Sequence, residues 1–139
     1  MTENIIKKAG DIISKNTREN GYCVLALIDD EGYPASSTIS ASKTNGIKEV
    51  AFCTGLNSPK AKRIKNSNKA SVCFNAPDYS ITLLGTIEIL TDPQIKKEMW
   101  YDGLKHHFTG PEDPNYCVLK LTTKQYSLFI DWQEIKGKL

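Results

Sequence analysis

Three consecutive residues at the start of a short basic segment could together hold an anion. The segment reads TGLNSPKAKRIKN over residues 54–66. Ser58 is a favoured helix N-cap, and Pro59 fits the first helical position because the N–H it lacks would have no helical partner there. Lys60 follows in the first turn, where the helix dipole disfavours a cation by about 0.3–1 kcal/mol. A bound anion removes this conflict, so the pattern predicts an anion site at the helix start.

The helical period separates the other cations of this segment. Ala61 and Ile64 lie three residues apart and mark the buried side of the helix. The other two lysines then point toward solvent, whereas Arg63 flanks the buried side together with Lys60. A short basic surface helix without a ligand would have the same sequence, and this alternative stays open.

A second polar stretch, SSTIS at residues 36–40, is expected on a strand. Alternation places Ser37 and Ile39 on one face and the other three residues on the opposite face. Small polar side chains on a half-buried strand allow a flat ligand to approach the backbone and to hydrogen-bond with it. A solvent-exposed sheet edge is the alternative.

The remaining reactive side chains lack the spacing of a metal or nucleophilic site. The chain contains no C-x-x-C pair, P-loop, G-x-S-x-G or G-x-G-x-x-G motif. The cysteines are expected to be small buried hydrophobes in a reducing compartment. The adjacent His106 and His107 would point in different directions, so we expect them to end a helix rather than to share a metal ion.

The composition is typical of one globular domain that spans residues 1–139. Hydrophobic residues make up 40% of the chain and charged residues 24%, with a formal net charge of +2. That charge is too small to indicate a nucleic acid or a membrane surface as partner. The longest apolar run, residues 23–28, is too short to span a membrane, and the N-terminus lacks a signal-peptide layout. We therefore expect a cytoplasmic protein.

Hydrophobic periodicity predicts three helices and a series of strands. The helices are expected over residues 4–18, after Ser58, and after Asp92-Pro93. Strands are expected over residues 22–28, 34–42, 47–54, 70–74 and 80–90, followed by 116–121 and 126–130 as two short strands or one bent strand. Gly85 is expected at a bulge, a barrel corner or a close backbone approach. Six to seven strands in hairpin order predict a mainly β, α+β fold: a small antiparallel barrel with about three covering helices.

Taken in order, these segments resemble the FMN-binding split barrel of the pyridoxamine 5'-phosphate oxidase-like superfamily. The most specific match is FCTGLNSPK at residues 52–60, where an apolar strand ends in threonine and Ser-x-Lys opens a helix. GYP at residues 32–34, ITLLGTIEILTD at 81–92, and the pattern of Trp, Phe-Thr-Gly, Asp-Pro and Tyr within 100–116 also match. Within the superfamily, the chain is similar to short bacterial proteins related to general stress protein 26.

The resemblance implies a homodimer with two FMN molecules at the subunit interface. The phosphate contacts of the family fall on residues 58–60, with Cys53 and Thr54 at the end of the preceding strand. The strand beside the isoalloxazine falls on residues 37–40. Ser80 falls where some members place a polar side chain on the flavin, and Trp100 and Phe129 are candidates for covering its ring. The implied cofactor-binding residues are Ser37, Thr38, Ile39, Ser40, Cys53, Thr54, Ser58, Pro59, Lys60, Ser80 and Trp100.

One position departs from the family pattern. Many members carry an arginine on the phosphate three residues after the proline of G-x-P, and Ser37 occupies that position here. Arg63 is a candidate for the missing cation, and the question stays open at this point. Some relatives bind a deazaflavin or haem in place of FMN.

The resemblance implies an FMN-dependent oxidoreductase with an unknown small-molecule substrate. The flavin would supply hydride chemistry, while the protein would supply orientation, hydrogen bonds and shielding from water. No catalytic acid or base is evident from the sequence. The alternative is a stress-related carrier or sensor that binds flavin, deazaflavin or haem without turnover. A small RNA-binding barrel is a third hypothesis, and the lack of aromatic residues among the cations of residues 60–65 argues against it.

Overall fold

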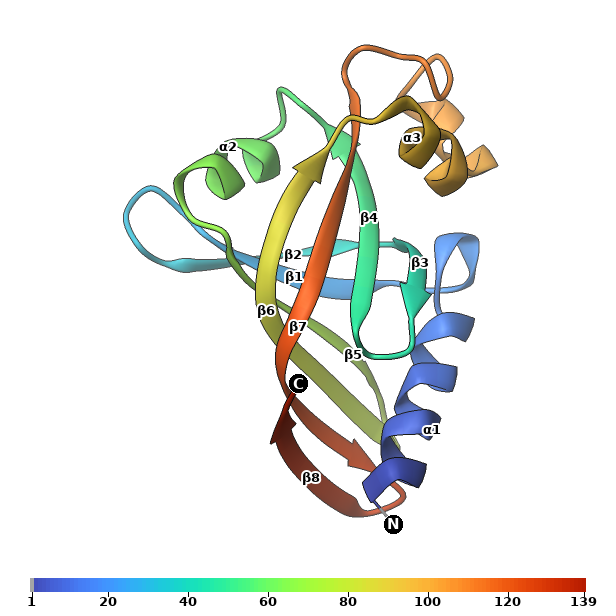
Figure 1. The fold of residues 1–139 in the computed structure, drawn as a ribbon, viewed down its shortest axis with the longest axis vertical. Helices are drawn as coiled ribbons and strands as arrows, with labels where there is room; N and C mark the ends of the chain where they lie inside the picture. Colours follow the sequence, from blue (N-terminus) through green and yellow to red (C-terminus); the bar gives the residue numbers. More distant parts are fainter. Residues whose placement is uncertain (1) are drawn as a thin grey trace.

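Residues 2–139, which the computed structural model describes, form one curled antiparallel sheet with helices around it (Figure 1). The strands are β1 Cys23–Ile28, β2 Pro34–Ile39, β3 Ala41–Asn45, β4 Glu49–Gly55, β5 Lys69–Ala76, β6 Tyr79–Leu90, β7 Tyr116–Ile130 and β8 Gln133–Lys138. The helices are α1 Thr2–Lys15, α2 Pro59–Asn66 and α3 Pro93–Met99, with two 3-10 helices, η1 Arg18–Asn20 and η2 Asp102–His106. The predicted fold class, mainly β with three covering helices, is confirmed.

The sheet is split at a single residue. Its strand order is β2-β1-β5-β6-β7-β4-β3, with β8 paired to β7, so β2 and β3 are the two ends of the path. Only Ser40 separates them in the chain. Ile39 pairs with Cys23 on β1, whereas Ala41 pairs with Phe52 on β4. Past that pair, residues 53–55 of β4 have no strand partner on the β3 side. We call this opening, between residues 37–40 and residues 53–55, the split.

The strand predicted over residues 34–42 is therefore wrong, because it forms two strands that pair with different neighbours. Ser40 donates its hydroxyl hydrogen bond to the carbonyl of Gly21 at 3.1 Å, which fixes the corner. Ala41 and Ser42 are both buried, and the register of β3 shifts after Ala41, so the alternation of a single strand is broken. The residues on both sides of the corner are compatible with one continuous strand, so the sequence carried no signal of the break.

One other boundary and the number of strands differ from the prediction. The first helix ends at Lys15 because the Asn16 side chain caps it by donating to the carbonyl of Ile12 at 2.8 Å. Residues 116–130 form one long strand, which confirms one of the two alternatives. Residues 2–139 form eight strands rather than six or seven, because β8 was missed. The sequence of β8, QEIKGK, has one large apolar residue and a weak period.

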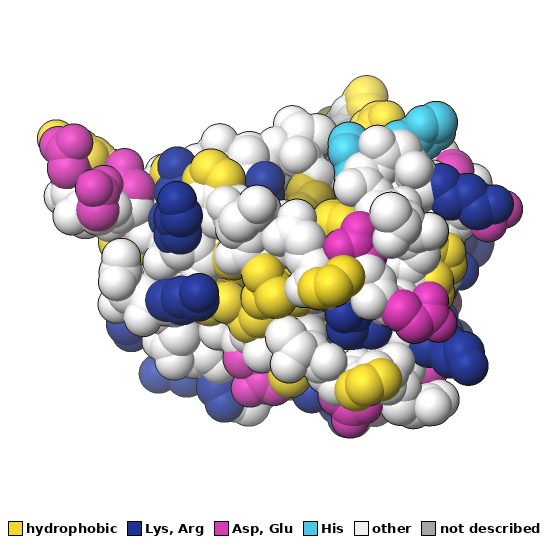
Figure 2. Space-filling view, turned by 90° about the horizontal axis from the view of Figure 1, so that it is seen from above, with side chains coloured by type: hydrophobic (Ala, Val, Ile, Leu, Met, Phe, Trp, Pro, Cys, Tyr) yellow, Lys and Arg dark blue, Asp and Glu magenta, His cyan; other side chains and the backbone are white. Residues whose placement is uncertain are grey.

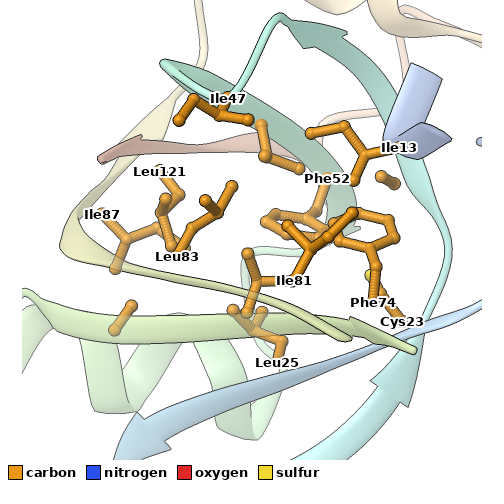
Figure 3. Packing of buried hydrophobic residues seen from close by; sticks show 14 of the residues in the cluster. Ile13, Cys23, Leu25, Ile47, Phe52, Phe74, Ile81, Leu83, Ile87 and Leu121 are labelled. Atoms are coloured by element: carbon orange, nitrogen blue, oxygen red, sulfur yellow. The ribbon is translucent and has the colours of Figure 1, made fainter. Parts of the chain in front are cut away.

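Aliphatic and aromatic side chains fill the inside of the curled sheet (Figure 3). Phe52, Phe74 and Ile81 meet in the centre of the cluster, and all three are buried. Each such side chain contributes roughly 1.5–3 kcal/mol through its burial. The predicted bulge at Gly85 is confirmed, since the β6–β7 register shifts there and any Cβ would overlap the Thr122 carbonyl.

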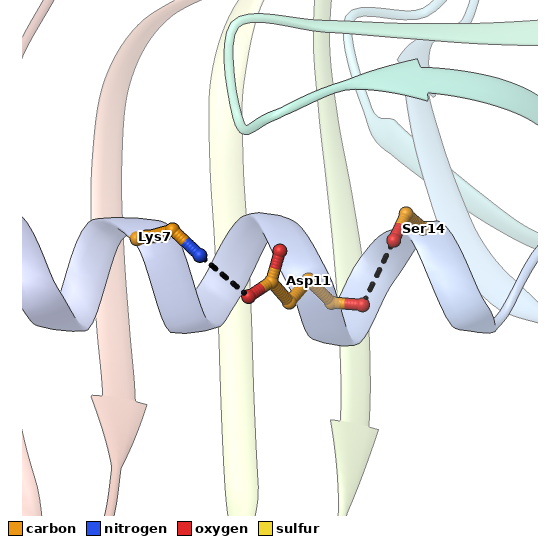
Figure 4. A network of polar contacts seen from close by, with 3 residues as sticks. All are labelled: Lys7, Asp11 and Ser14. Carbon is orange, nitrogen blue, oxygen red and sulfur yellow. Dashed lines mark hydrogen bonds and ion pairs between the residues drawn. The ribbon is translucent and has the colours of Figure 1, made fainter.

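Helix α1 packs against the sheet through its apolar face, which buries Ile5, Ala9 and Ile13. Its solvent face carries a Lys7–Asp11 ion pair at 3.4 Å, and the Ser14 hydroxyl donates to the carbonyl of Asp11 at 2.9 Å (Figure 4). Exposed pairs of this spacing are worth about 0.3–0.5 kcal/mol, so the apolar face holds the helix in place. Across residues 2–139, no helix combines the length and the hydropathy needed to cross a bilayer.

Candidate functional site

The start of α2 has the geometry that the sequence predicts. Ser58 is the N-cap, and its Oγ accepts a hydrogen bond from the N–H of Ala61 at 3.2 Å. Pro59 occupies the first helical position. Thr54, at the end of β4, donates its hydroxyl hydrogen bond to Ser58 Oγ at 3.2 Å. Two hydroxyl groups and the free N–H groups of the first turn are thus held together beside the split.

The loop that leads into α2 is fixed by Asn115, the residue before β7. The N–H of Leu56 donates to the Asn115 carbonyl at 2.7 Å, and the N–H of Asn57 donates to Asn115 Oδ1 at 3.2 Å. A Cβ at Gly55 would lie 2.9 Å from the Asn115 side-chain nitrogen, so a larger residue here would displace the side chain that holds the loop. The helix start is therefore held rigidly before any ligand arrives.

Two cations of α2 have no counter-ion among residues 2–139: Lys60 in the first turn and Arg63 in the last. Lys60 and Arg63 are both half-buried, and neither belongs to any of the ion pairs formed within residues 2–139. Burial, followed by the charge of Arg63, lowers the pKa of Lys60. Figure 2 shows Lys and Arg side chains gathered next to an apolar area, on the left, where α2 lies in Figure 1. A half-buried cation with a cationic neighbour is stabilised by an anion, so the chemistry of this point favours a phosphate or carboxylate.

Strand β2 presents the predicted residues on two faces. Ser37 and Ile39 pair with Leu25 and Cys23 of β1, which are buried. Since direct partners in an antiparallel ladder share a face, Ser37 and Ile39 face the inside of the sheet. Thr38 lies between them on the outer face and is exposed. The predicted separation of Ser37 and Ile39 from Thr38 is confirmed.

Cys53 and Trp100 belong to a second apolar cluster, beneath α3 and η2. The Cys53 thiol donates to the carbonyl of Met99 at 3.6 Å and lies 3.6 Å from Tyr116 Oη. Trp100 packs edge-on against the Tyr116 ring, with centroids 5.4 Å apart. Burial raises the pKa of Cys53 to about 11, so its thiol is neutral near pH 7 and is no nucleophile.

Ser80 and Phe129 lie away from the other predicted residues. They are direct partners on β6 and β7. Strands β1 and β5 lie between β2 and β6, so Ser80 is about 14 Å from β2 across the sheet. One chain therefore does not bring Ser80 and the residues of β2 together, and the predicted flavin contacts of Ser80 and Phe129 stay predictions.

Three predicted residues meet around a cavity of about 340 Å³ beside the split. Ile39, Ser40 and Cys53 line it from β2, the corner and β4. Arg18 and Tyr101 line it as well, although the sequence analysis did not single them out. No local pattern marks these two residues, because only the packing of η1 and η2 next to the split brings them together.

The histidines lie at the outer rim of this region. His106 is the last residue of η2 and His107 follows it, which confirms the prediction that the pair ends a helix. Both are exposed. Within residues 2–139 no three His, Cys, Asp or Glu side chains are arranged as metal ligands would be.

Comparison with known proteins adds a family and a fold. The family model described as "Pyridoxamine 5'-phosphate oxidase" matches residues 11–129. A pyridoxine/pyridoxamine 5'-phosphate oxidase from Blochmanniella pennsylvanica is 29% identical over 91 residues, which cover 64% of this chain and 38% of that protein. The chain thus matches well under half of the length of this curated relative.

Two solved structures illustrate the shared fold. A Clostridium acetobutylicum protein related to general stress protein 26 of Bacillus subtilis is 23% identical with a TM-score of 0.85, over 100% of this chain and 97% of that one. A pyridoxamine 5'-phosphate oxidase-related, FMN-binding protein from Nostoc punctiforme is 15% identical with a TM-score of 0.68, over 99% and 94%. At these identities the structures show the fold alone. The family match covers most of the residues, from residue 11 in the second half of α1 to residue 129 near the end of β7, so the chain belongs to the pyridoxamine 5'-phosphate oxidase family.

Proposed function

We propose that this protein binds FMN at the split, with the phosphate at the start of α2. The observation that carries the proposal is the pair of half-buried cations, Lys60 and Arg63, which lack a carboxylate partner beside a capped helix start. A phosphate satisfies the free N–H groups and both charges at once. Membership of the family supports a flavin as the carrier of that phosphate.

Each part of the site has a separate task in this proposal. Lys60 and the Ser58 hydroxyl bind the phosphate, and Arg63 supplies the cation that Ser37 does not. The backbone of residues 37–40 lies beside the ring and orients it, while Ile39 excludes water from the inner side. The bound flavin would supply hydride chemistry, so the proposed activity is that of an oxidoreductase with a small-molecule substrate.

A carrier without turnover is the second candidate, and one observation favours it. The protic groups nearest the split are held neutral: burial raises the pKa of Cys53 to about 11 and that of Tyr101 to about 12. Neither can act as a base near pH 7. Steady-state assays with NAD(P)H and candidate acceptors separate the two functions. A rate above that of free FMN supports the enzyme, and no rate above it supports the carrier.

We further propose that the protein is a homodimer that packs through the outer face of β2, β1, β5 and β6. By the register of these strands, Thr38, Val24, Cys73 and Thr82 lie side by side across this face. All four side chains are small, and Val24 is 39% exposed. A face of small side chains suits close packing against a second copy. Sedimentation equilibrium should give twice the chain mass of 15.5 kDa, and a single-chain mass would contradict the proposal.

The flavin site is tested by two lysines of the same helix. Lys60→Ala removes the half-buried cation, whereas Lys62→Ala removes an exposed one and serves as the matched control. Purified protein is loaded with FMN, dialysed, and measured by its flavin absorption. We expect the wild type and Lys62→Ala to retain FMN and Lys60→Ala to lose most of it. A deazaflavin or haem ligand would give a different spectrum, and a wild type that stays colourless would contradict the proposal.

A further inference from the structure

The cavity beside the split is a distinct space with its own cation. It has a volume of about 340 Å³, at the small end of the range for ligand sites. Residues from η1, from the corner at Ser40 and from η2 line it. It shares Ile39, Ser40 and Cys53 with the proposed flavin site, so a molecule in this cavity would lie next to that site. The inference that follows rests on the proposed function, which it extends to a second ligand.

Arg18 is held in place at this cavity. Its backbone has φ of 57°, in the left-handed region that an arginine seldom adopts. Its Nε donates to the carbonyl of Ser42 at 3.1 Å, and its guanidinium carbon lies 5.4 Å from the centre of the Tyr101 ring. Ser42 is itself buried and donates its hydroxyl hydrogen bond to the carbonyl of Met99 at 2.6 Å. Unfavourable backbone angles persist where the surroundings enforce them, often at binding sites.

The guanidinium retains unused binding capacity. Among residues 2–139 its hydrogen bond comes from Nε alone, and no carboxylate lies within ion-pair distance of Arg18. The two terminal nitrogens can therefore form the paired hydrogen bonds that guanidinium makes with a carboxylate. The neutral thiol of Cys53 and the neutral phenol of Tyr101 do not compete for this positive charge.

The other walls restrict the shape and charge of a ligand. The side chains of Ile39 and Leu104 and the ring of Tyr101 are apolar surfaces suited to a flat ring. Glu19 also lines the cavity, and its carboxylate would repel a second negative charge. His107 lies at the exposed side and is compatible with an anion. These features favour a planar molecule with one negative charge over a phosphate dianion.

We propose that the cavity binds the substrate of the flavin, and that this substrate is a small aromatic carboxylate. Arg18 pairs with the carboxylate group, and Tyr101, Ile39 and Leu104 enclose the ring. Glu19 acts as a selectivity residue that disfavours doubly charged ligands. The protein thus has two anion sites that select by charge and shape. One holds the phosphate at α2, and the other holds a carboxylate between η1 and η2.

Benzoate is the probe, and flavin-free protein is the sample. Isothermal titration should show that benzoate binds. The affinities of benzamide and phenyl phosphate should each be lower by about tenfold or more, because benzamide lacks the negative charge and phenyl phosphate carries a second one. Arg18→Asn should weaken benzoate by about tenfold or more, since it removes the charge-assisted hydrogen bonds while asparagine tolerates the left-handed backbone. Glu19→Gln should tighten benzoate and phenyl phosphate several-fold. Equal binding of benzoate and benzamide, or an unchanged affinity in Arg18→Asn, would overturn the proposal.

Two further measurements separate this proposal from the flavin proposal. Lys60→Ala should lose FMN but keep its benzoate affinity. Arg18→Asn should keep FMN and still unfold in one transition, at a lower temperature because the Ser42 carbonyl loses its donor. Benzoate added to FMN-loaded protein should shift the flavin absorption without releasing FMN. Displacement of FMN by benzoate would show that the cavity belongs to the flavin itself and would overturn the second site. If the protein never binds FMN, the titrations of flavin-free protein still decide the carboxylate site.

Discussion

The start of α2 and the cavity between η1 and η2 both present half-buried cations without a carboxylate partner, but they are built in different ways. At α2, Ser58, Pro59 and Lys60 are consecutive, and the cap bonds lie within a few residues of one another. At the cavity, Arg18 and Tyr101 come from opposite halves of the chain, and their placement depends on Ser42 and the apolar cluster beneath α3. The first site is local, and the second is a product of tertiary packing.

The strongest way to break this comparison is to damage the apolar cluster beneath α3 and η2, on which the second site rests. Tyr116 is 0% exposed, contacts Trp100 and Cys53, and donates its hydroxyl hydrogen bond to the carbonyl of Lys96 at 2.8 Å. Tyr116→Ala should lower the free energy of unfolding by about 3–5 kcal/mol, as large aromatic deletions do. Denaturant unfolding measures this, and benzoate binding should fall much further than FMN binding.

Tyr116→Phe is the control for that variant. It keeps the ring and leaves one buried carbonyl without its donor, so its cost should be about 1–3 kcal/mol. If both Tyr116 variants weakened FMN and benzoate equally, the two sites would share one support and the comparison would fail.

A variant with a smaller expected effect tests the local site at the start of α2. Ser58→Ala removes the N-cap oxygen that accepts from the N–H of Ala61. The free energy of unfolding should fall by about 0.5–2 kcal/mol, with weaker FMN binding and unchanged benzoate binding. Ser67→Ala, at the other end of α2, is the matched control, because the cap hydrogen bond there comes from its backbone N–H and survives the change. A benzoate affinity that fell with Ser58→Ala would indicate that the two sites are coupled.

The smallest expected effect is a pH dependence of the local site. Burial and Arg63 lower the pKa of Lys60 in the folded protein below its ordinary value of 10.5. Between the folded pKa of Lys60 and 10.5, the unfolded chain binds more protons than the folded protein. This lysine therefore makes the protein more stable as pH rises through that range. The buried cysteines and tyrosines change the stability with pH in the opposite direction. The free energy of unfolding is therefore measured for the wild type and for Lys60→Gln at several pH values, and the difference between the two isolates the contribution of Lys60.

Bound phosphate should remove this pH dependence. An anion at α2 favours charged Lys60 and raises its pKa, so the gain at high pH should disappear when FMN is present. A gain of the same size with and without FMN would place the cofactor away from Lys60.

What could be predicted from the sequence follows the same division. Ser58-Pro59-Lys60 was recognisable because capping depends on neighbours in the chain, and the alternation of Ser37, Thr38 and Ile39 was recognisable because a strand has a period of two. The break at Ser40 was not recognisable, since the residues on both sides fit one strand or two. Arg18 and Tyr101 carry no local signal at all, because their contact exists only after η1 and η2 have packed. Strand β8 was missed because a single large apolar residue gives no period.

The corner at Ser40 constrains how the length of this chain can vary during evolution. Ile39 and Ala41 are locked into ladders with β1 and β4, so an inserted or deleted residue here has no loop to absorb it. A one-residue slip of β2 would turn Ser37 and Ile39 outward and Thr38 inward. We therefore expect relatives to vary in the identity of the residue at the corner and to conserve the spacing across it, with insertions collected at the β1–β2 turn instead.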